Sequence, residues 1–298
     1  MNTFKFTLLI LLTTFLMGSS FSVGKIGLSY SSPLLLAALR FTLAGFIMAV
    51  IVIALKRQHP ASKGNWVKML IIGTFQTAGV MGCIFLSLRT ITASESSILT
   101  FTNPLLVVVF GTIFLQTRYK FYQWIGVLLG LVGVSITMGA QIEFKIGIIF
   151  GILSAVFWAI STLLVKKWGS FFDTWVLSSY QMLFGGLLLL LGSFILEKPV
   201  FILNGNLLFI LLWLSIMSSI VQFAVWYYLL QKGDPGKTSA FLFLAPFFGV
   251  LSGWLLLGET LYPSIIVGGL FIIIGIYLVN RNFQQKKSLV KRTLQINE

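Results

Sequence analysis

The stretch from Leu34 to Leu55 reads LLLAALRFTLAGFIMAVIVIAL and contains one charged residue, Arg40. An α-helix rises about 1.5 Å per residue, so about 20 apolar residues cross a hydrocarbon core roughly 30 Å thick. The stretch is long enough to do so. In lipid, backbone amides must be bonded within a helix or a closed barrel, and this unbroken run lacks the alternation of a barrel strand. It therefore predicts a transmembrane helix.

Similar apolar runs recur along the whole chain. We place ten of them, at residues 6–24, 34–55, 67–88, 96–115, 121–140, 146–165, 174–196, 207–230, 238–258 and 262–280. The composition agrees, because 57% of the 298 residues are hydrophobic and only 9% are charged, too few to cover a soluble domain of this length. The predicted fold class is all-α, a polytopic membrane protein with ten transmembrane helices.

The first run also has features of a cleavable signal peptide. Lys5 precedes most of it, and the small residues Gly18-Ser19-Ser20 lie near its end. The run is longer than the usual ~7 to 15 apolar residues of a signal peptide, and nine more runs follow it. We therefore interpret it as the first membrane helix.

The basic residues lie mostly in short gaps between the apolar runs. With 21 Lys and Arg against 7 Asp and Glu, the formal charge is +14, but no basic patch has interleaved aromatics, so nucleic acid is not an expected partner. Lys and Arg in short loops resist translocation, and a cytoplasmic N-terminus leaves few of them outside. Those few are Lys25, Arg89, Lys145 and Lys198. We predict a multi-pass cell-membrane protein in the lipid bilayer, with both termini cytoplasmic.

The two halves of the chain resemble each other at an offset of 141 to 142 residues. The matched positions are Met17 to Lys25 with Trp158 to Lys166, Arg40 with Gln181, Asn103-Pro104 with Ala245-Pro246, and Gly126 and Gly133 with Gly268 and Gly275. Five spans per half is an odd number, so the second repeat enters the membrane from the opposite side. We predict inverted repeats at 1–140 and 141–280, followed by a basic cytoplasmic tail at 281–298. Such repeats favour a carrier that works by alternating access.

Several short motifs follow one another in a fixed order. They are Gly18-Ser19-Ser20-Phe21 followed by Lys25, the Pro33 to Arg40 segment, Asn103-Pro104-Leu105, Ala245-Pro246 leading to Leu257-Gly258-Glu259, and Gly268-Gly269 with Gly275. In this order and spacing they resemble the EamA-type members of the drug/metabolite transporter superfamily, over nearly the whole chain. The resemblance implies two five-helix repeats and export of amino acids or related metabolites.

The first half departs from the family pattern at two places. Met17 stands where the family usually has Trp, and Gln116-Thr117 stands where Gly-Glu is expected. The second half keeps both features, as Trp158 and Gly258-Glu259. If the glutamate serves ion coupling, the first repeat lacks that role; if it caps a helix, little changes.

Arg40 is the most conspicuous charge within a predicted span, where insertion of arginine costs at least ~2.5 kcal/mol. Two hypotheses remain open. The side chain reaches the outer interface or pairs with backbone carbonyls, or its planar donor fork binds a substrate carboxylate.

Other polar and aromatic residues within the spans are candidates for a wet cavity. With Arg40, the predicted substrate-binding set is Gln76, Thr77, Phe101, Asn103, Trp158, Gln222 and Trp226. Buried amides need partners, which substrate, water or a neighbouring helix can supply. The family resemblance places the sixth helix, and so Trp158, beside the central cavity. The matched prolines Pro104 and Pro246 are predicted hinges, with a static kink as the alternative.

An enzyme is not expected. The seven acidic residues are scattered, and His59 and Cys83 are the only residues of their kinds, so no nucleophile–base pair or metal cluster is visible. No cofactor or metal is predicted. Glu95 and Glu259 are expected in water at the outer side, which gives proton coupling no support. The alternative function is a lipid or polyprenyl-carrier flippase, which needs a side opening lined with basic residues.

Overall fold

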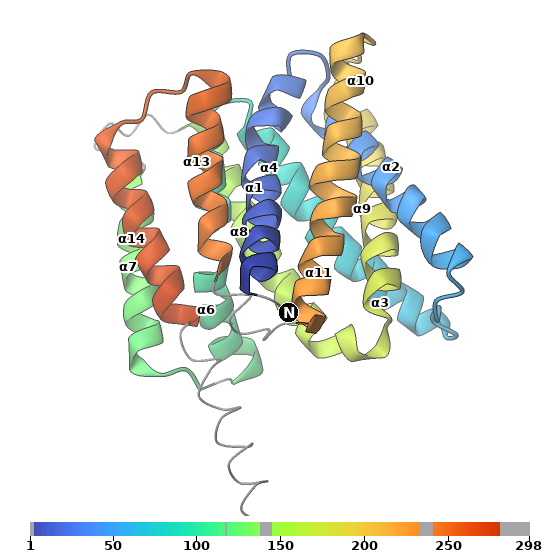
Figure 1. The fold of residues 1–298 in the computed structure, drawn as a ribbon, viewed down its shortest axis with the longest axis horizontal. Helices are drawn as coiled ribbons and strands as arrows, with labels where there is room; N and C mark the ends of the chain where they lie inside the picture. The colour runs from blue at the N-terminus through green and yellow to red at the C-terminus, as the bar shows by residue number, and fades with distance from the viewer. Residues whose placement is uncertain (1–2, 117, 138–144, 233–240, 281–298) are drawn as a thin grey trace, which may run out of the picture.

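The computed structural model describes residues 3–116, 118–137, 145–232 and 241–280, which form a bundle of helical crossings (Figure 1). Seven crossings are long apolar helical stretches and three are shorter apolar helices, which confirms the predicted ten. The continuous ones are α1 (Thr3–Gly27), α2 (Pro33–Ala54), α7 (Phe121–Thr137), α8 (Ile146–Trp168), α9 (Thr174–Leu196) and α14 (Pro263–Asn280). The predicted boundary at residue 140, the start of the ninth run at 238 and the tail at 281–298 lie outside the described residues.

The other four crossings are built from consecutive pieces. The third is α3 (Lys63–Gly73), η1 (Thr74–Gly79) and α4 (Val80–Ser87); the fourth is α5 (Ala93–Thr100) and α6 (Asn103–Leu115); the eighth is α10 (Gly205–Leu212), η3 (Trp213–Val221) and α11 (Gln222–Lys232); the described part of the ninth is η4 (Phe241–Phe243) and α13 (Leu244–Leu257). A short 3₁₀ turn, η2 (Gly169–Phe171), follows α8. Both η1 and η3 are π-helical, and the 141 to 142-residue offset superimposes them. π-helical turns are rare and are often found at functional sites.

Polar residues at the helix ends extend several crossings beyond the apolar runs. The side chains of Ser62, Asp173 and Asn204 accept hydrogen bonds from backbone N–H groups of the first turns that follow. Thr92 and Glu95 form a capping box at the start of α5. The third and fourth crossings therefore begin three to four residues earlier than their apolar runs predict.

The bundle has two ends. We call the end at which α1 starts the N-terminal face, and the opposite end the distal face. Figure 1 shows α1 leaving the N-terminal face and α14 returning to it, as expected for an even number of crossings. At this face, Arg57 and Asp173 form an ion pair with an N–O distance of 3.6 Å. At the opposite, distal face, Ser31 and Phe201 form a β-bridge between the α1–α2 and α9–α10 connections.

The packing of the helices repeats between the halves. α2 packs against α9, and α7 against α14, so corresponding helices of the two repeats meet. α1 packs against α13 and α11, as α8 packs against α5, α6, η1 and α4. α1 runs toward the distal face. α8 runs away from that face, as shown by Gly147 in its first turn, which lies against Thr90 in the connection between α4 and α5. The two repeats are therefore inverted, as predicted.

Close backbone approaches mark the axis between the repeats. A Cβ added at Gly275 would lie 2.5 Å from the carbonyl oxygen of Gly126, and one added at Gly133 would lie 2.6 Å from the carbonyl oxygen of Gly268. The four glycines that the repeat matches in sequence thus meet in the structure. Small residues let membrane helices pack at this distance.

Candidate functional site

The fourth crossing is broken near its middle. α5 ends at Thr100, and α6 begins after a two-residue turn with Pro104 in its first turn. Proline has no N–H, so the carbonyl of Thr100 cannot receive the bond that a continuous helix would give it. Pro246 likewise lies in the first turn of α13, after η4. Both prolines occupy positions that helices tolerate, and their role as hinges stays a prediction.

The two pieces of the fourth crossing have different neighbours. Both pieces pack against α8, but α5 otherwise packs mainly against α13 and α1, with fewer contacts to α7 and α14, whereas α6 packs mainly against α7 and α14. Within the described part of the chain, α6 makes no comparable packing with α1 or α13. The fourth crossing is therefore attached to α1 and α13 through α5, the piece nearer the distal face.

Aromatic rings from three helices gather at the break. The ring centroid of Phe101 lies 5.9 Å from that of Phe21 on α1 and 5.5 Å from that of Trp158 on α8. Phe101 is buried, and Trp158 is half-buried. The structure thus brings together two of the predicted substrate residues, and it adds Phe21, which the sequence analysis placed only in a family motif.

Three predicted amide side chains have no hydrogen-bond partner among the described residues. Gln76, Asn103 and Gln222 make no side-chain hydrogen bond to any other residue that the structure describes. Asn103, at the first turn of α6, and Gln222, at the first turn of α11, are only 8% and 4% exposed. Trp226 follows Gln222 by about one helical turn and is half-buried. None of their amide atoms is among the fully enclosed polar atoms without a partner, so water or a substrate can reach and satisfy these groups.

The guanidinium of Arg40 is bound by the π-helical segment η3. Its Nε donates to Ser219 Oγ at 3.0 Å, and its Nη2 donates to the carbonyl oxygen of Ser218 at 2.9 Å and to Ser218 Oγ at 3.1 Å. Ser215 Oγ donates in turn to the carbonyl oxygen of Arg40. Of the two sequence-based hypotheses, these contacts favour pairing with the backbone of a neighbouring helix.

The same contact recurs in the other half with uncharged residues. Thr77 on η1 donates its Oγ1 hydrogen to Gln181 Oε1 at 2.8 Å. Gln181 is the repeat partner of Arg40, and the same offset relates Thr77 to Ser218 and Ser219. Neither the serines nor Gln181 were among the residues predicted to interact, although the repeat offset relates Thr77 to the serines and Arg40 to Gln181.

The prediction that Glu259 lies in water is wrong. Its side chain is only 7% exposed, because the chain after α13 turns the carboxylate toward the start of α5. Glu95 is half-buried at the same helix start. No group of three or more His, Cys, Asp or Glu side chains is positioned for a metal ion within 3–116, 118–137, 145–232 and 241–280.

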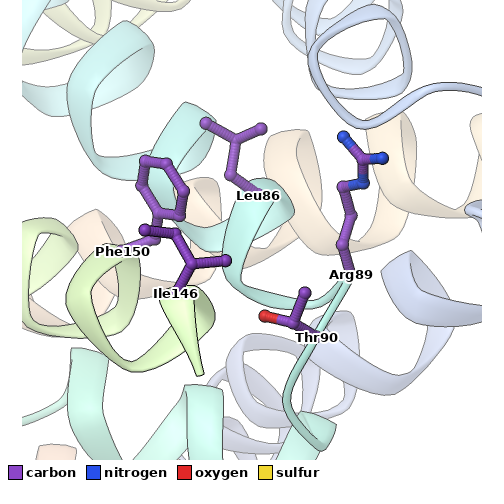
Figure 2. A pocket seen from close by; sticks show the side chains of 5 residues that line it. All are labelled: Leu86, Arg89, Thr90, Ile146 and Phe150. Atoms are coloured by element: carbon purple, nitrogen blue, oxygen red, sulfur yellow. The ribbon is translucent and has the colours of Figure 1, made fainter. Parts of the chain in front are cut away.

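A surface pocket of about 370 Å³ lies between the distal ends of α4 and α8 (Figure 2). It is lined by Leu86, Arg89, Thr90, Ile146 and Phe150. In Figure 2 the guanidinium of Arg89 points away from the three apolar side chains. None of the predicted substrate residues lines it, so the break in the fourth crossing remains the candidate site.

Comparisons with known proteins agree with this architecture. The sequence profile of the EamA-like transporter family matches twice, at residues 5–139 and 145–281. The chain is 28% identical to "Uncharacterized transporter YvbV" of Bacillus subtilis (strain 168), over 94% of this chain and 93% of the relative. It is 25% identical to the "Probable amino-acid metabolite efflux pump" of Salmonella typhimurium (strain LT2), over 97% of each protein.

A solved structure shares the fold. It superimposes with a TM-score of 0.66 over 92% of this chain and 97% of its own, at 20% sequence identity. Two family matches that together span most of the chain decide the family. The chain is a multi-pass membrane transporter that belongs to the EamA-like family of the drug/metabolite transporter superfamily.

Proposed function

We propose that the protein exports amino acids or related small metabolites across the cell membrane by alternating access, with both termini in the cytoplasm. The inverted repeats support this mechanism, since each half can adopt the conformation of the other about an axis in the membrane plane. The substrate class is supported by the similarity to the relative whose description reads "Probable amino-acid metabolite efflux pump".

The broken fourth crossing is the single observation that carries the proposed site. The N-terminus of α6 points a partial positive charge into the bundle, which favours a substrate carboxylate. The carbonyl of Thr100, which Pro104 cannot bond, is an acceptor for a substrate ammonium. Phe101 and Trp158 offer apolar contact beside these groups, and Asn103 supplies an amide that has no hydrogen-bond partner in the described part of the chain.

Other predicted residues have secondary places in this proposal. Gln76, Gln222 and Trp226 belong to the polar lining of the third and eighth crossings, where water or substrate satisfies the amides. Arg40 and Thr77 contact the opposite repeat, so we assign them to the interface between the halves. Pro104 and Pro246 begin the segments that change neighbours during transport.

A lipid or polyprenyl-carrier flippase is the less favoured alternative. Such a protein needs basic side chains in an opening toward lipid. The guanidinium of Arg40 is enclosed by η3, and the pocket of Figure 2 has one basic residue, Arg89, which points away from its apolar wall.

The test is substrate flux in proteoliposomes, guided by a metabolite comparison of cells that lack or overproduce the protein. Trp158→Ala and Asn103→Ala are expected to reduce the rate for the identified substrate about tenfold or more, as loss of a buried contact does. Trp254→Ala is the matched control, because Trp254 is 52% exposed on the outer side of α13. If no amino acid or metabolite of a broad panel is transported, the proposed function is refuted. If all three variants lose the same share of the transport rate, the proposed site is refuted.

A further inference from the structure

The carboxylate of Glu259 bridges two helices of opposite repeats at the distal face. Its oxygens accept hydrogen bonds from the backbone N–H of Ala93 at 2.6 Å, from the backbone N–H of Ser94 at 3.0 Å and from Ser94 Oγ at 2.7 Å. Glu259 follows α13 in the ninth crossing, whereas Ala93 and Ser94 begin α5 in the fourth. One side chain thus caps a helix to which it is not connected in sequence.

The first crossing joins the same cluster. Lys25, near the end of α1, donates its Nζ hydrogen to the carbonyl oxygen of Ile91 at 2.5 Å and lies 3.9 Å from Glu259 Oε1. The first, fourth and ninth crossings are therefore tied together at this face, and the fourth is the one that carries the candidate site. The hydrogen bonds to Glu259 are charge-assisted, nearly buried and aligned with the positive end of the helix dipole, so they outweigh the long ion pair.

The sequence around the carboxylate is shaped for this contact. Gly258 has φ +62°, a left-handed conformation that lets the chain turn back after α13. Gly253 lies beneath the carboxylate, where a Cβ would overlap Glu259 Oε2 and Ser94 Oγ. Gly253 leaves the space that the carboxylate occupies, and Gly258 allows the turn of the chain that points Glu259 toward α5. A side chain at either position would disturb the contact.

By sequence, the position of the first repeat that corresponds to Glu259 holds no carboxylate. The repeat offset relates Gly258 to Gln116, which also has a left-handed φ, of +49°. The residue after it is Thr117 by sequence, in place of Glu259, and it lies outside the described residues. The glutamate at this position of the repeat is therefore present in the second half and replaced by threonine in the first.

We propose that Glu259 is the gate residue of the distal end of the transport pathway. This inference rests on the proposed alternating access, and it states which contact must break for the distal end to open. When the halves exchange conformations, α5 separates from α13, and the α5 N-terminus leaves the Glu259 carboxylate. Because the first repeat has Thr117 by sequence where the second has Glu259, the closed distal face is favoured at rest.

Glu197 provides a matched control on the same face. Its carboxylate also caps a helix of the opposite repeat, accepting from the backbone N–H of Leu34 at 3.3 Å and of Leu35 at 2.9 Å. However, it joins α9 to α2, two continuous helices that correspond to each other as wholes and meet at the axis. Exchange of the two halves leaves that pair of neighbours unchanged, so Glu197 has no gating role. Glu259 instead joins α13 to α5, and α13 corresponds to α6, not to α5, so the exchange does not preserve this contact.

The experiment measures thiol accessibility in intact cells. The single cysteine is removed by Cys83→Ala, and Ser97→Cys places a reporter on α5, where Ser97 is fully buried against Gly249. A membrane-impermeant maleimide is added from outside. In a separate variant, Arg89→Cys reports whether the distal face is extracellular, since Arg89 is exposed there.

Glu259→Ala and Glu259→Gln are expected to raise the labelling rate of the Ser97→Cys reporter. Loss of a charge-assisted contact predicts an increase of about tenfold for alanine, with a smaller increase for glutamine, which keeps one acceptor. Glu197→Ala should leave the rate unchanged. Labelling that does not rise in either Glu259 variant, or that rises equally in Glu197→Ala, would overturn the gate.

The readout also separates this inference from the proposed function. Labelling does not require a substrate, so a failure to find flux leaves the accessibility result intact. Normal flux together with unchanged labelling would retain the transporter and reject Glu259 as its gate. If Arg89→Cys is not labelled from outside, the same reporters are tested in inverted vesicles, where labelling unchanged by Glu259→Ala would again reject the gate.

Discussion

Replacing Gly275 by alanine tests the packing of the two repeats at their axis. The added Cβ would lie 2.5 Å from the carbonyl oxygen of Gly126 and 3.0 Å from the backbone nitrogen of Gly130. Ordinary contacts require α7 and α14 to move apart by roughly 1 Å, and overpacking of this kind costs about 1–3 kcal/mol. Alanine returns up to about 1 kcal/mol in helix propensity. We expect a net loss of about 1–2 kcal/mol.

Gly192→Ala is the matched control for this measurement. Gly192 lies in α9, also within a helix, and a Cβ there meets nothing within 4 Å. The substitution should therefore keep or raise stability through helix propensity alone. Thermal unfolding of the purified protein in detergent measures both, and Gly275→Ala should lower the midpoint by several degrees, at about 2–4 °C per kcal/mol. If Gly275→Ala unfolds at or above the midpoint of Gly192→Ala, the close crossing of α7 and α14 is refuted.

Three further predictions address the interface, the helix ends and the topology. A double-mutant cycle of Thr77→Val and Gln181→Leu should give a coupling energy of about 0.5–1.5 kcal/mol in thermal unfolding, and a value near zero would contradict the hydrogen bond between η1 and α9. Gly258→Ala should destabilise the protein and Gln116→Gly should stabilise it, each by about 1 kcal/mol, because both positions have a left-handed φ; changes of the same sign would refute this reasoning. Reporter tags fused to the two ends of the chain should lie on the same side of the membrane, and opposite sides would exclude ten crossings.

The helix ends show where counting apolar residues falls short. The sixth apolar run ends at residue 165, but α8 continues to Trp168 through Lys166 and Lys167. Basic residues in a last turn are favoured by the helix dipole. Because these lysines are polar, a count of apolar residues stops before them and misses the last turn of the helix. The early starts of α3 and α5 have the corresponding cause, since Ser62 and Thr92 are polar caps.

The sequence by itself determined the number of crossings, their helical nature and the inversion of the halves. Each of these follows from a local property, because bilayer thickness sets the length of every apolar run and an odd number of runs per repeat fixes the inversion. The repeat also determined which glycines correspond. Gly126 and Gly133 meet Gly275 and Gly268 as antiparallel helices at an axis must.

Only the tertiary structure decided what the polar residues do. Arg40 and Ser218 are far apart in the chain, as are Glu259 and Ala93. Whether such a group is bonded, hydrated or buried depends on which helices become neighbours, and a single span does not contain that information. The free energy of a charge in the bundle is set by the donor or acceptor that packing brings to it, which is why Glu259 is a buried cap rather than a hydrated surface residue.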